Sequence, residues 1–190
     1  MPSSPDTPAA IVRRKARCFR RDRRGSAAVE FALVAPVFFG LLFAIIEAAL
    51  VFFASQTLET ATQDVARLVM TGQAQGIGYT QSQFKDQVCS RISALFDCQN
   101  GIYVDVESFP SFDKAIPPDA IDPNKQFVTT MQYKPGQACD VVLVRLFYQW
   151  PVFVTRLGYD YDMSNLGNGK RLLTATAAFR NEPFGSGACP

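Results

Sequence analysis

The sequence predicts an α+β protein, in which one long N-terminal helix and a second, shorter helix precede a small antiparallel β-sheet. Three observations support this fold class. An apolar run that begins at Phe31 continues into an amphipathic pattern, three glycines then end that pattern, and the hydrophobic period changes from helical to alternating near residue 102. A chain of 190 residues has room for one modest domain with appendages.

The first helix is predicted to run from Ser26 to Thr71. Its apolar part extends from Phe31 to Ala54, and Glu47 is the one charged residue in it. A helix of 24 residues is roughly 36 Å long, which is enough to cross a hydrocarbon core of about 30 Å. A cleaved secretory signal would have an apolar region of about 7–15 residues, followed by a small-residue cleavage site. The sequence therefore predicts a retained transmembrane helix.

Basic residues crowd the segment before this helix. Residues 1–25 carry eight lysines and arginines against two aspartates, a net +6, whereas the rest of the chain carries a net −4. A basic segment directly before a membrane helix keeps that end of the chain in the cytoplasm, so we prefer this interpretation to nucleic-acid binding. The predicted organisation is a basic cytoplasmic leader (1–25), a transmembrane helix (26–54) and an extracytoplasmic, periplasmic domain (55–190), with a single pass through the inner (cytoplasmic) membrane.

The extracytoplasmic domain is predicted to begin with the amphipathic end of the first helix. An apolar stripe repeats there in steps of three and four residues from Ala54 to Leu68. The sequence GQAQGIG at 72–78 predicts a helix stop and a loop. A second amphipathic helix is expected over 81–96, followed by strands over 101–109, 126–133, 140–150 and 171–180 and by loops over 111–126 and 155–170.

Five cysteines are divided between the two sides of the predicted membrane helix. Cys18 lies in the cytoplasmic leader and should stay reduced, whereas four lie in the extracytoplasmic domain, where an oxidising compartment favours disulfides. Four cysteines allow three pairings, and the preferred one joins Cys89 to Cys98 and Cys139 to Cys189. Four free thiols are the alternative. Zinc is disfavoured because the chain has no histidine and no C-x-x-C spacing.

No residue pattern predicts an enzyme. The absence of histidine excludes Ser-His-Asp and Cys-His nucleophiles, and the chain has no glycine-rich phosphate-binding motif. Asp160 and Asp162 are two close acids, but they lack the glycine and the terminal glutamate of a calcium loop. An anchored hydrolase would need such carboxylates, together with Asp140, in one cleft. We expect no catalytic site, no cofactor and no metal.

The junction RRGSAAVEFALVAPVFFG (23–40) resembles the processing site of type IV pilins. In that family a prepilin peptidase cuts after the glycine, and the fifth residue of the mature chain is glutamate. The cut would here follow Gly25, making Ser26 the first residue, Glu30 the fifth and Phe31 the sixth. More narrowly, the A-x-V-E-F-A-L pattern, the proline after it and a second glutamate at Glu47 are similar to TadE-like pseudopilins of the tight-adherence (Flp) pilus. LLTATAAFRNEP (172–183) loosely resembles the end of such proteins.

This resemblance implies a pseudopilin-like membrane protein that acts in pilus assembly. Its implied partners are the prepilin peptidase, other pilins or pseudopilins, pilus assembly proteins and membrane lipid. The cut would create an α-amino group on Ser26, and the resemblance implies that Glu30 of one subunit meets that amine on a neighbour. A charge at the bilayer centre costs on the order of 2.5–3.5 kcal/mol, which is why a partner is needed.

Several alternatives stay open at this point. Glu30 could instead be hydrated among the lipid headgroups. Glu47 lies about 26 Å from Glu30 along the helix axis, where it could be solvated at the outer interface or contact another helix of the assembly. The other class of function is a membrane-anchored extracytoplasmic binding or adhesion module, which would keep residues 1–25 on the mature chain.

Overall fold

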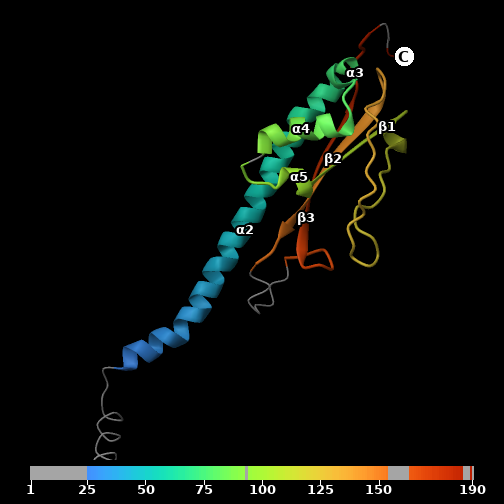
Figure 1. Ribbon diagram of the computed structural model, residues 1–190. Helices are drawn as coiled ribbons and strands as arrows, with labels where there is room; N and C mark the ends of the chain where they lie inside the picture. Colours follow the sequence, from blue (N-terminus) through green and yellow to red (C-terminus); the bar gives the residue numbers. More distant parts are fainter. Residues whose placement is uncertain (1–24, 93, 154–162, 186–188, 190) are drawn as a thin grey trace, which may run out of the picture. The chain divides into compact units, whose positions relative to one another are not determined.

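The computed structural model describes residues 25–92, 94–153, 163–185 and 189. The fold is α+β, as predicted (Figure 1). The chain separates into two compact units, residues 1–43 and 44–190. α2 (Ser26–Met70) contributes to both units. The long helix predicted from the sequence is thus confirmed, with an end one residue earlier than expected. Residues 1–24 of the predicted leader, with Cys18, and the acids Asp160 and Asp162 lie outside the described residues.

The core of the second unit is built on one face of α2. The buried apolar side chains on this part of the helix follow each other in steps of three and four residues, which places most of them on one stripe. They are Val51, Ala54, Leu58, Ala61, Val65 and Val69, all at most 7 % exposed. α4 (Gln81–Ile92) adds Phe84, Val88 and Ile92 to the same hydrophobic cluster. Both amphipathic helices predicted from the sequence therefore contribute to one core.

Two helical regions differ from the predictions by more than one residue. The predicted loop at 72–78 contains a short helix, α3 (Gln73–Ile77), because Gly72 and Gly78 take the left-handed backbone conformation on either side of it. The second helix ends at Ile92 instead of 96, and a second short helix, α5 (Cys98–Gly101), follows. Phe96 is buried although it lies beyond the end of α4. The apolar spacing that predicted helix up to residue 96 therefore marks buried positions and not the extent of the helix.

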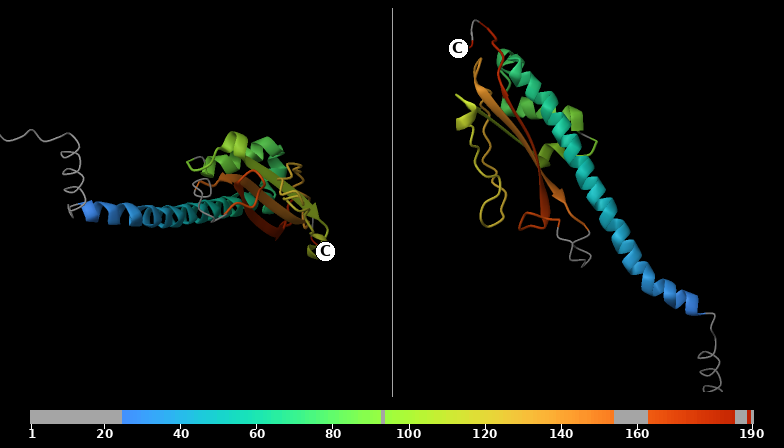
Figure 2. Two further views of the ribbon diagram at one scale, coloured as in Figure 1. Left: turned by 90° about the horizontal axis from the view of Figure 1, so that it is seen from below. Right: turned by 180° about the vertical axis from the view of Figure 1, so that it is seen from behind.

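Three antiparallel strands form the sheet in the order β1-β2-β3, with bounds β1 (Ile102–Phe109), β2 (Val141–Pro151) and β3 (Lys170–Arg180). β2 is central, and its first seven residues are all buried. Side chains of α2, α4 and one face of the sheet share a single cluster of buried residues, and Figure 2 shows α4 over this face. β3 is left at one edge of the sheet, on the side of α2.

The strand predicted at 126–133 is not formed. This segment makes isolated bridges, Val106 with Tyr133 and Ile121 with Phe127, and no ladder. Val106 bonds to the carbonyl of residue 132 and to the N–H of residue 134, and a parallel ladder would next need the carbonyl of Val104. That carbonyl accepts instead from the side chain of Gln81 at 2.8 Å. The alternating pattern of this segment therefore indicates that one of its faces packs against the domain. It does not lead to a strand, because Gln81 of α4 bonds the Val104 carbonyl.

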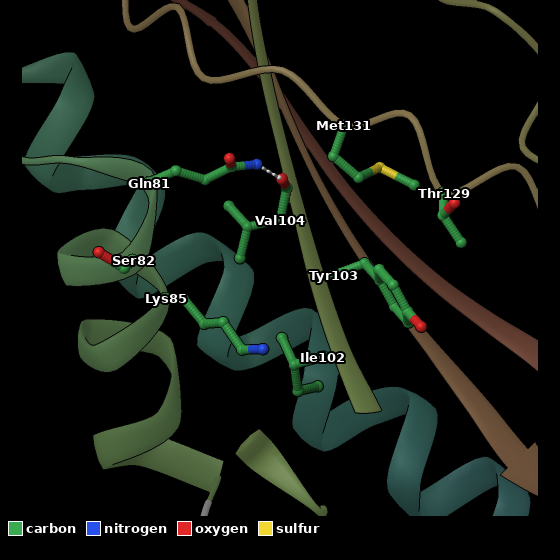
Figure 3. Close-up of a pocket in the computed structure, with 8 residues that line it drawn as sticks. All are labelled: Gln81, Ser82, Lys85, Ile102, Tyr103, Val104, Thr129 and Met131. Carbon is green, nitrogen blue, oxygen red and sulfur yellow. Dashed lines mark hydrogen bonds between the residues drawn. The ribbon is translucent and has the colours of Figure 1, made fainter. Parts of the chain in front are cut away.

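A cavity of about 360 Å³ opens where this ladder stops. Figure 3 shows that Gln81 and Lys85 of α4 lie on one side of it, and Thr129 and Met131 of the irregular segment on the other. The predicted loop at 111–126 is irregular apart from η2 (Phe112–Lys114), a single turn of 3-10 helix.

Two disulfides close the domain, in the pairing preferred from the sequence. Cys89 of α4 is joined to Cys98 at the start of α5, and the two Cα atoms are 5.6 Å apart. Cys139, just before β2, is joined to Cys189, which is 50 residues further along the chain. The first disulfide holds the reversal between α4 and α5, and the second fixes the C-terminal segment beside β2.

Candidate functional site

The predicted processing site lies at the start of α2. Gly25 has 3-10 helical conformation and directly precedes Ser26, the first residue of α2, and it does not have a positive φ. A Cβ atom placed on Gly25 would meet nothing within 4 Å. Gly72, at the other end of the same helix, has φ 74°, and a Cβ there would come within 2.4 Å of the ring of Phe184. The fold therefore requires a glycine at position 72, and the described structure gives no reason for one at position 25.

Glu30 lies on the exposed surface of the first helical turns. The hydroxyl of Ser26 donates a hydrogen bond to Glu30 Oε1 at 3.0 Å. The two residues are four apart, so they occupy adjacent positions on one face of the helix. This contact holds the carboxylate beside the residue that would become the N-terminus if the chain were cut after Gly25.

The helix around Glu30 exposes apolar side chains on all sides. Val29, Phe31 and Leu33 are 61 %, 67 % and 72 % exposed, and the large apolar residues from Val34 to Ile46 are exposed as well. A helix that is apolar all round is stable only where lipid or other protein covers it. α2 contains one stretch that is long and apolar enough to span a membrane, and 22 % of it is buried in the structure.

Glu47 occupies a different environment from Glu30. Its side chain is only 6 % exposed, and the backbone N–H of Phe153 donates a hydrogen bond to its carboxylate. Glu47 lies four residues before Val51, in phase with the buried stripe of α2. Its carboxylate therefore faces the folded domain of its own chain. The contact with another helix of an assembly, expected from the sequence as one alternative, stays a prediction.

Two acidic side chains that the sequence did not single out come together among the described residues of the domain. Asp140 accepts from the N–H of Gln137 in its own turn. Asp105 and Glu107 of β1 instead share one guanidinium, that of Arg145 on β2, at 2.5 Å and 3.2 Å. Burial, followed by repulsion from Asp105, raises the pKa of the Glu107 carboxyl.

This cluster has a structural task. The same Arg145 side chain donates to the carbonyl of Pro118 at 2.8 Å, and Asp105 accepts from the N–H of Gln132. The charged groups thereby fasten the irregular segments 115–122 and 126–134 to the outer face of the sheet. Charged side chains so deeply buried need this dense pairing, because an unpaired charge in that position would be costly.

The comparisons with known proteins fit the geometry of α2. Residues 25–67 match the model of the TadE-like protein family. The resemblance seen in the sequence is thus confirmed over this stretch, which begins at Gly25 and includes Glu30 and Glu47. The comparison with curated proteins and the comparison with solved structures each gave no match. The TadE-like segment ends within α2 and does not reach the sheet. It indicates a membrane protein associated with the tight-adherence (Tad) pilus.

Sequence reasoning missed two features of the structure. The first is the direction of Glu47, which could have been found by extending the apolar stripe backwards from Ala54 through Val51 in helical steps. The second is the ion-pair cluster on the sheet. Its signal is the alternation of Asp105 and Glu107 on one face of β1, but the cation that pairs with them comes from a strand 40 residues away, so the pairing could not be read locally.

Proposed function

We propose that this chain is a pseudopilin-like subunit in the assembly of a tight-adherence pilus, and that a prepilin peptidase processes it after Gly25. The observation that carries the proposal is the contrast between Gly25 and Gly72. The described structure accounts for the glycine at 72 by a positive φ and a close contact, but gives no reason for a glycine at 25 or at 76. Gly25 differs from Gly76 because it stands between the basic residues and the apolar helix that carries Glu30. A peptidase whose site admits only a very small side chain supplies the missing reason. The basic residues before the glycine fit a cytoplasmic leader.

After the cut, the amine of Ser26 and the carboxylate of Glu30 form a charge pair at the end of an apolar helix. In one chain the Ser26 hydroxyl already reaches this carboxylate. We infer that the amine of a neighbouring subunit takes over as the partner of Glu30 when helices pack side by side. Because a charge in a low-dielectric surrounding strongly favours its partner, this pair would set the axial register between subunits.

The exposed apolar surface around this pair has two successive roles in the proposal. In the membrane it contacts lipid, and the chain spans the inner membrane once with residues 1–25 in the cytoplasm. In the assembly the side chains of Val29, Phe31, Leu33 and their neighbours pack against other pilins or pseudopilins. The domain then lies on the periplasmic side, where its two disulfides can form.

N-terminal sequencing and intact mass of the membrane-extracted protein test the processing step. In cells that make the pilus, the wild-type chain should lose residues 1–25 and begin at Ser26. Gly25→Val should keep the leader, because the branched side chain is excluded from the peptidase site, and Gly25→Ala should be the mildest disruption. Gly76→Val is the matched control, since Gly76 also has nothing within 4 Å of a Cβ and lies far from the junction in sequence.

Glu30→Ala separates processing from assembly. It removes the carboxylate and leaves the bond after Gly25 intact, so the leader should still be lost while incorporation into the pilus assembly fails. Crosslinking to other pilus subunits measures the second step. A wild-type chain that still begins at Met1 in piliated cells would reject the proposal and favour an anchored binding or adhesion module that is never cut.

A further inference from the structure

Over part of its length, the outer edge of β3 carries backbone groups that have no partner among the described residues. Pairing with β2 uses every second residue of an edge strand, and the residues between them direct their N–H and C=O groups outward. At the start of β3, the outward carbonyl of Lys170 accepts from the N–H of Leu166 and the outward N–H of Leu172 donates to Asn165. By the same alternation, Thr174, Thr176 and Ala178, further along β3, direct their backbone N–H and C=O groups away from β2. Among the described residues, no group bonds to them on that side.

This stretch has none of the usual protection of an edge strand. Edge strands are normally kept from pairing by proline, by charged side chains along the edge, by a bulge or by a covering element. Residues 173–179 of β3 include no proline and no charge, and the β2–β3 register is continuous from Val141–Arg180 to Pro151–Lys170. The opposite edge of the sheet is better covered, because the bridge at Val106 and the side chain of Gln81 occupy backbone groups of β1.

A groove runs beside the open edge. It has a volume of about 330 Å³ and lies between Arg67 and Met70 of α2 and residues 176–179 of β3. The views from two sides agree in placing β3 as the strand next to this part of α2 (Figure 2). A strand added to β3 would direct every second side chain into this groove, which gives side-chain specificity to a contact made by backbone hydrogen bonds.

The charges around the edge define the occupant. β3 carries three cations, Lys170, Arg171 and Arg180, and no acid among its eleven residues. Arg67 adds a fourth cation at the rim of the groove. The nearby Asp64 is already in an ion pair with Arg91 at 3.8 Å, and Glu182 lies beyond the end of the strand. An incoming strand with acidic ends would meet opposite charges on both sides of the open stretch.

The same charges disfavour a second copy of this chain as the occupant. Antiparallel pairing of two β3 strands over the open stretch brings the basic start of one strand close to the basic end of the other. Like charges that lie opposite or diagonal across a strand pair are destabilising. We therefore propose that the edge of β3 over Thr174–Ala178 receives an extended segment of another protein, apolar or β-branched in its centre and acidic at its ends, which adds a fourth strand to the sheet. This inference does not depend on processing after Gly25.

Binding of a defined peptide to the full chain in detergent micelles tests the proposal. The probe is a labelled octapeptide of alternating valine and threonine with glutamate at both ends, and the comparison peptide carries lysine at both ends. Fluorescence anisotropy should show tighter binding of the glutamate peptide, by about tenfold at low salt. Hydrogen exchange should slow at the amides of Thr174, Thr176 and Ala178 when this peptide is bound.

Two pairs of variants locate the contact. Thr176→Pro removes one outward N–H and should weaken binding by about tenfold, while the ladder to β2 survives because that N–H is not part of it. Thr176→Val keeps the N–H and should bind like the wild type. Arg67→Glu should reverse part of the preference for glutamate ends, and Lys114→Glu, the same charge change outside the groove, should not.

Circular dichroism and the thermal midpoint check that Thr176→Pro is folded. Should that variant unfold, the exchange pattern and the Arg67 pair still decide the question. Equal binding of the two peptides, or peptide-induced protection confined to the cavity beside Gln81 and Val104, would overturn the inference. So would slow exchange at the three β3 amides in a self-associated chain without peptide, because the occupant would then be a second copy.

Discussion

Residues 25–43 and residues 44–185 use the same apolar residue types in opposite ways. In the first region Phe31 and Leu33 are 67 % and 72 % exposed, whereas Leu58, on the same helix in the second region, is fully buried. The difference is not in the helix, which is continuous. The difference lies in the elements that pack against the helix. In the second region the sheet and α4 cover its apolar stripe, and no described element does so in the first. The apolar surface of the first region is left exposed.

The largest expected effect on stability comes from truncating a side chain of the buried stripe of α2. Leu58→Ala should lower the free energy of unfolding of the domain by about 2–5 kcal/mol, because it leaves a cavity in the core. Leu33→Ala is the matched control and should leave the unfolding of the domain unchanged. Urea unfolding in detergent micelles, followed through the fluorescence of Trp150, measures both. Equal effects of the two variants would show that the regions do not differ as described.

The two disulfides extend the comparison within the domain. Removing the disulfide Cys139–Cys189, whose cysteines are 50 residues apart, should lower the free energy of unfolding by about 4 kcal/mol in the loop-entropy account. Removing Cys89–Cys98, whose cysteines are 9 residues apart, should lower it by about 2.7 kcal/mol. Paired Cys→Ser variants measured by urea unfolding give the order of the two effects. Peptide mapping without reductant should show both pairs in protein from intact cells. Free thiols at all four positions would contradict the pairing.

Gly25 and Gly72 give a smaller and more specific contrast. Gly72→Ala should destabilise the domain by about 1–2 kcal/mol for the left-handed backbone alone, with more from the contact with Phe184. Gly25→Ala should not change the thermal midpoint of the domain. Thermal unfolding monitored by circular dichroism measures both variants. A loss of stability in Gly25→Ala would supply a structural reason for that glycine and weaken the argument for processing.

The smallest expected effect concerns pH. The pKa of Glu107 is raised in the folded chain, so the protonated form of its carboxyl stabilises the folded state. This contribution to the free energy of unfolding is lost as the pH rises from the ordinary pKa of 4.5 through the raised value. Glu107→Gln cannot ionise and should gain stability relative to the wild type over this interval, up to a plateau. Parallel urea titrations between pH 4 and pH 8 measure the difference. A difference that shrinks with rising pH would reverse the assigned direction.

The sequence by itself determined the elements whose signals are local. The continuous apolar run and the three glycines predicted the extent of α2. The alternation at 102–106 predicted β1, and the runs at 140–150 and 171–180 predicted β2 and β3. The combination of Gly25, Glu30 and the apolar helix gave the TadE-like resemblance. These features depend on residues that are neighbours along the chain, and helical or strand periodicity is enough to find them.

Only the tertiary structure decided features that depend on groups far apart in sequence. The segment 126–133 has the alternation of a strand but no ladder, because a glutamine from α4 bonds the carbonyl it would need. The helical phase of Glu47 can be read from its neighbours, but its hydrogen-bond partner cannot, because the N–H that it accepts from belongs to Phe153, 106 residues away. The open edge of β3 follows from strand order alone, since a strand with the same sequence in the centre of the sheet would have all its backbone groups paired.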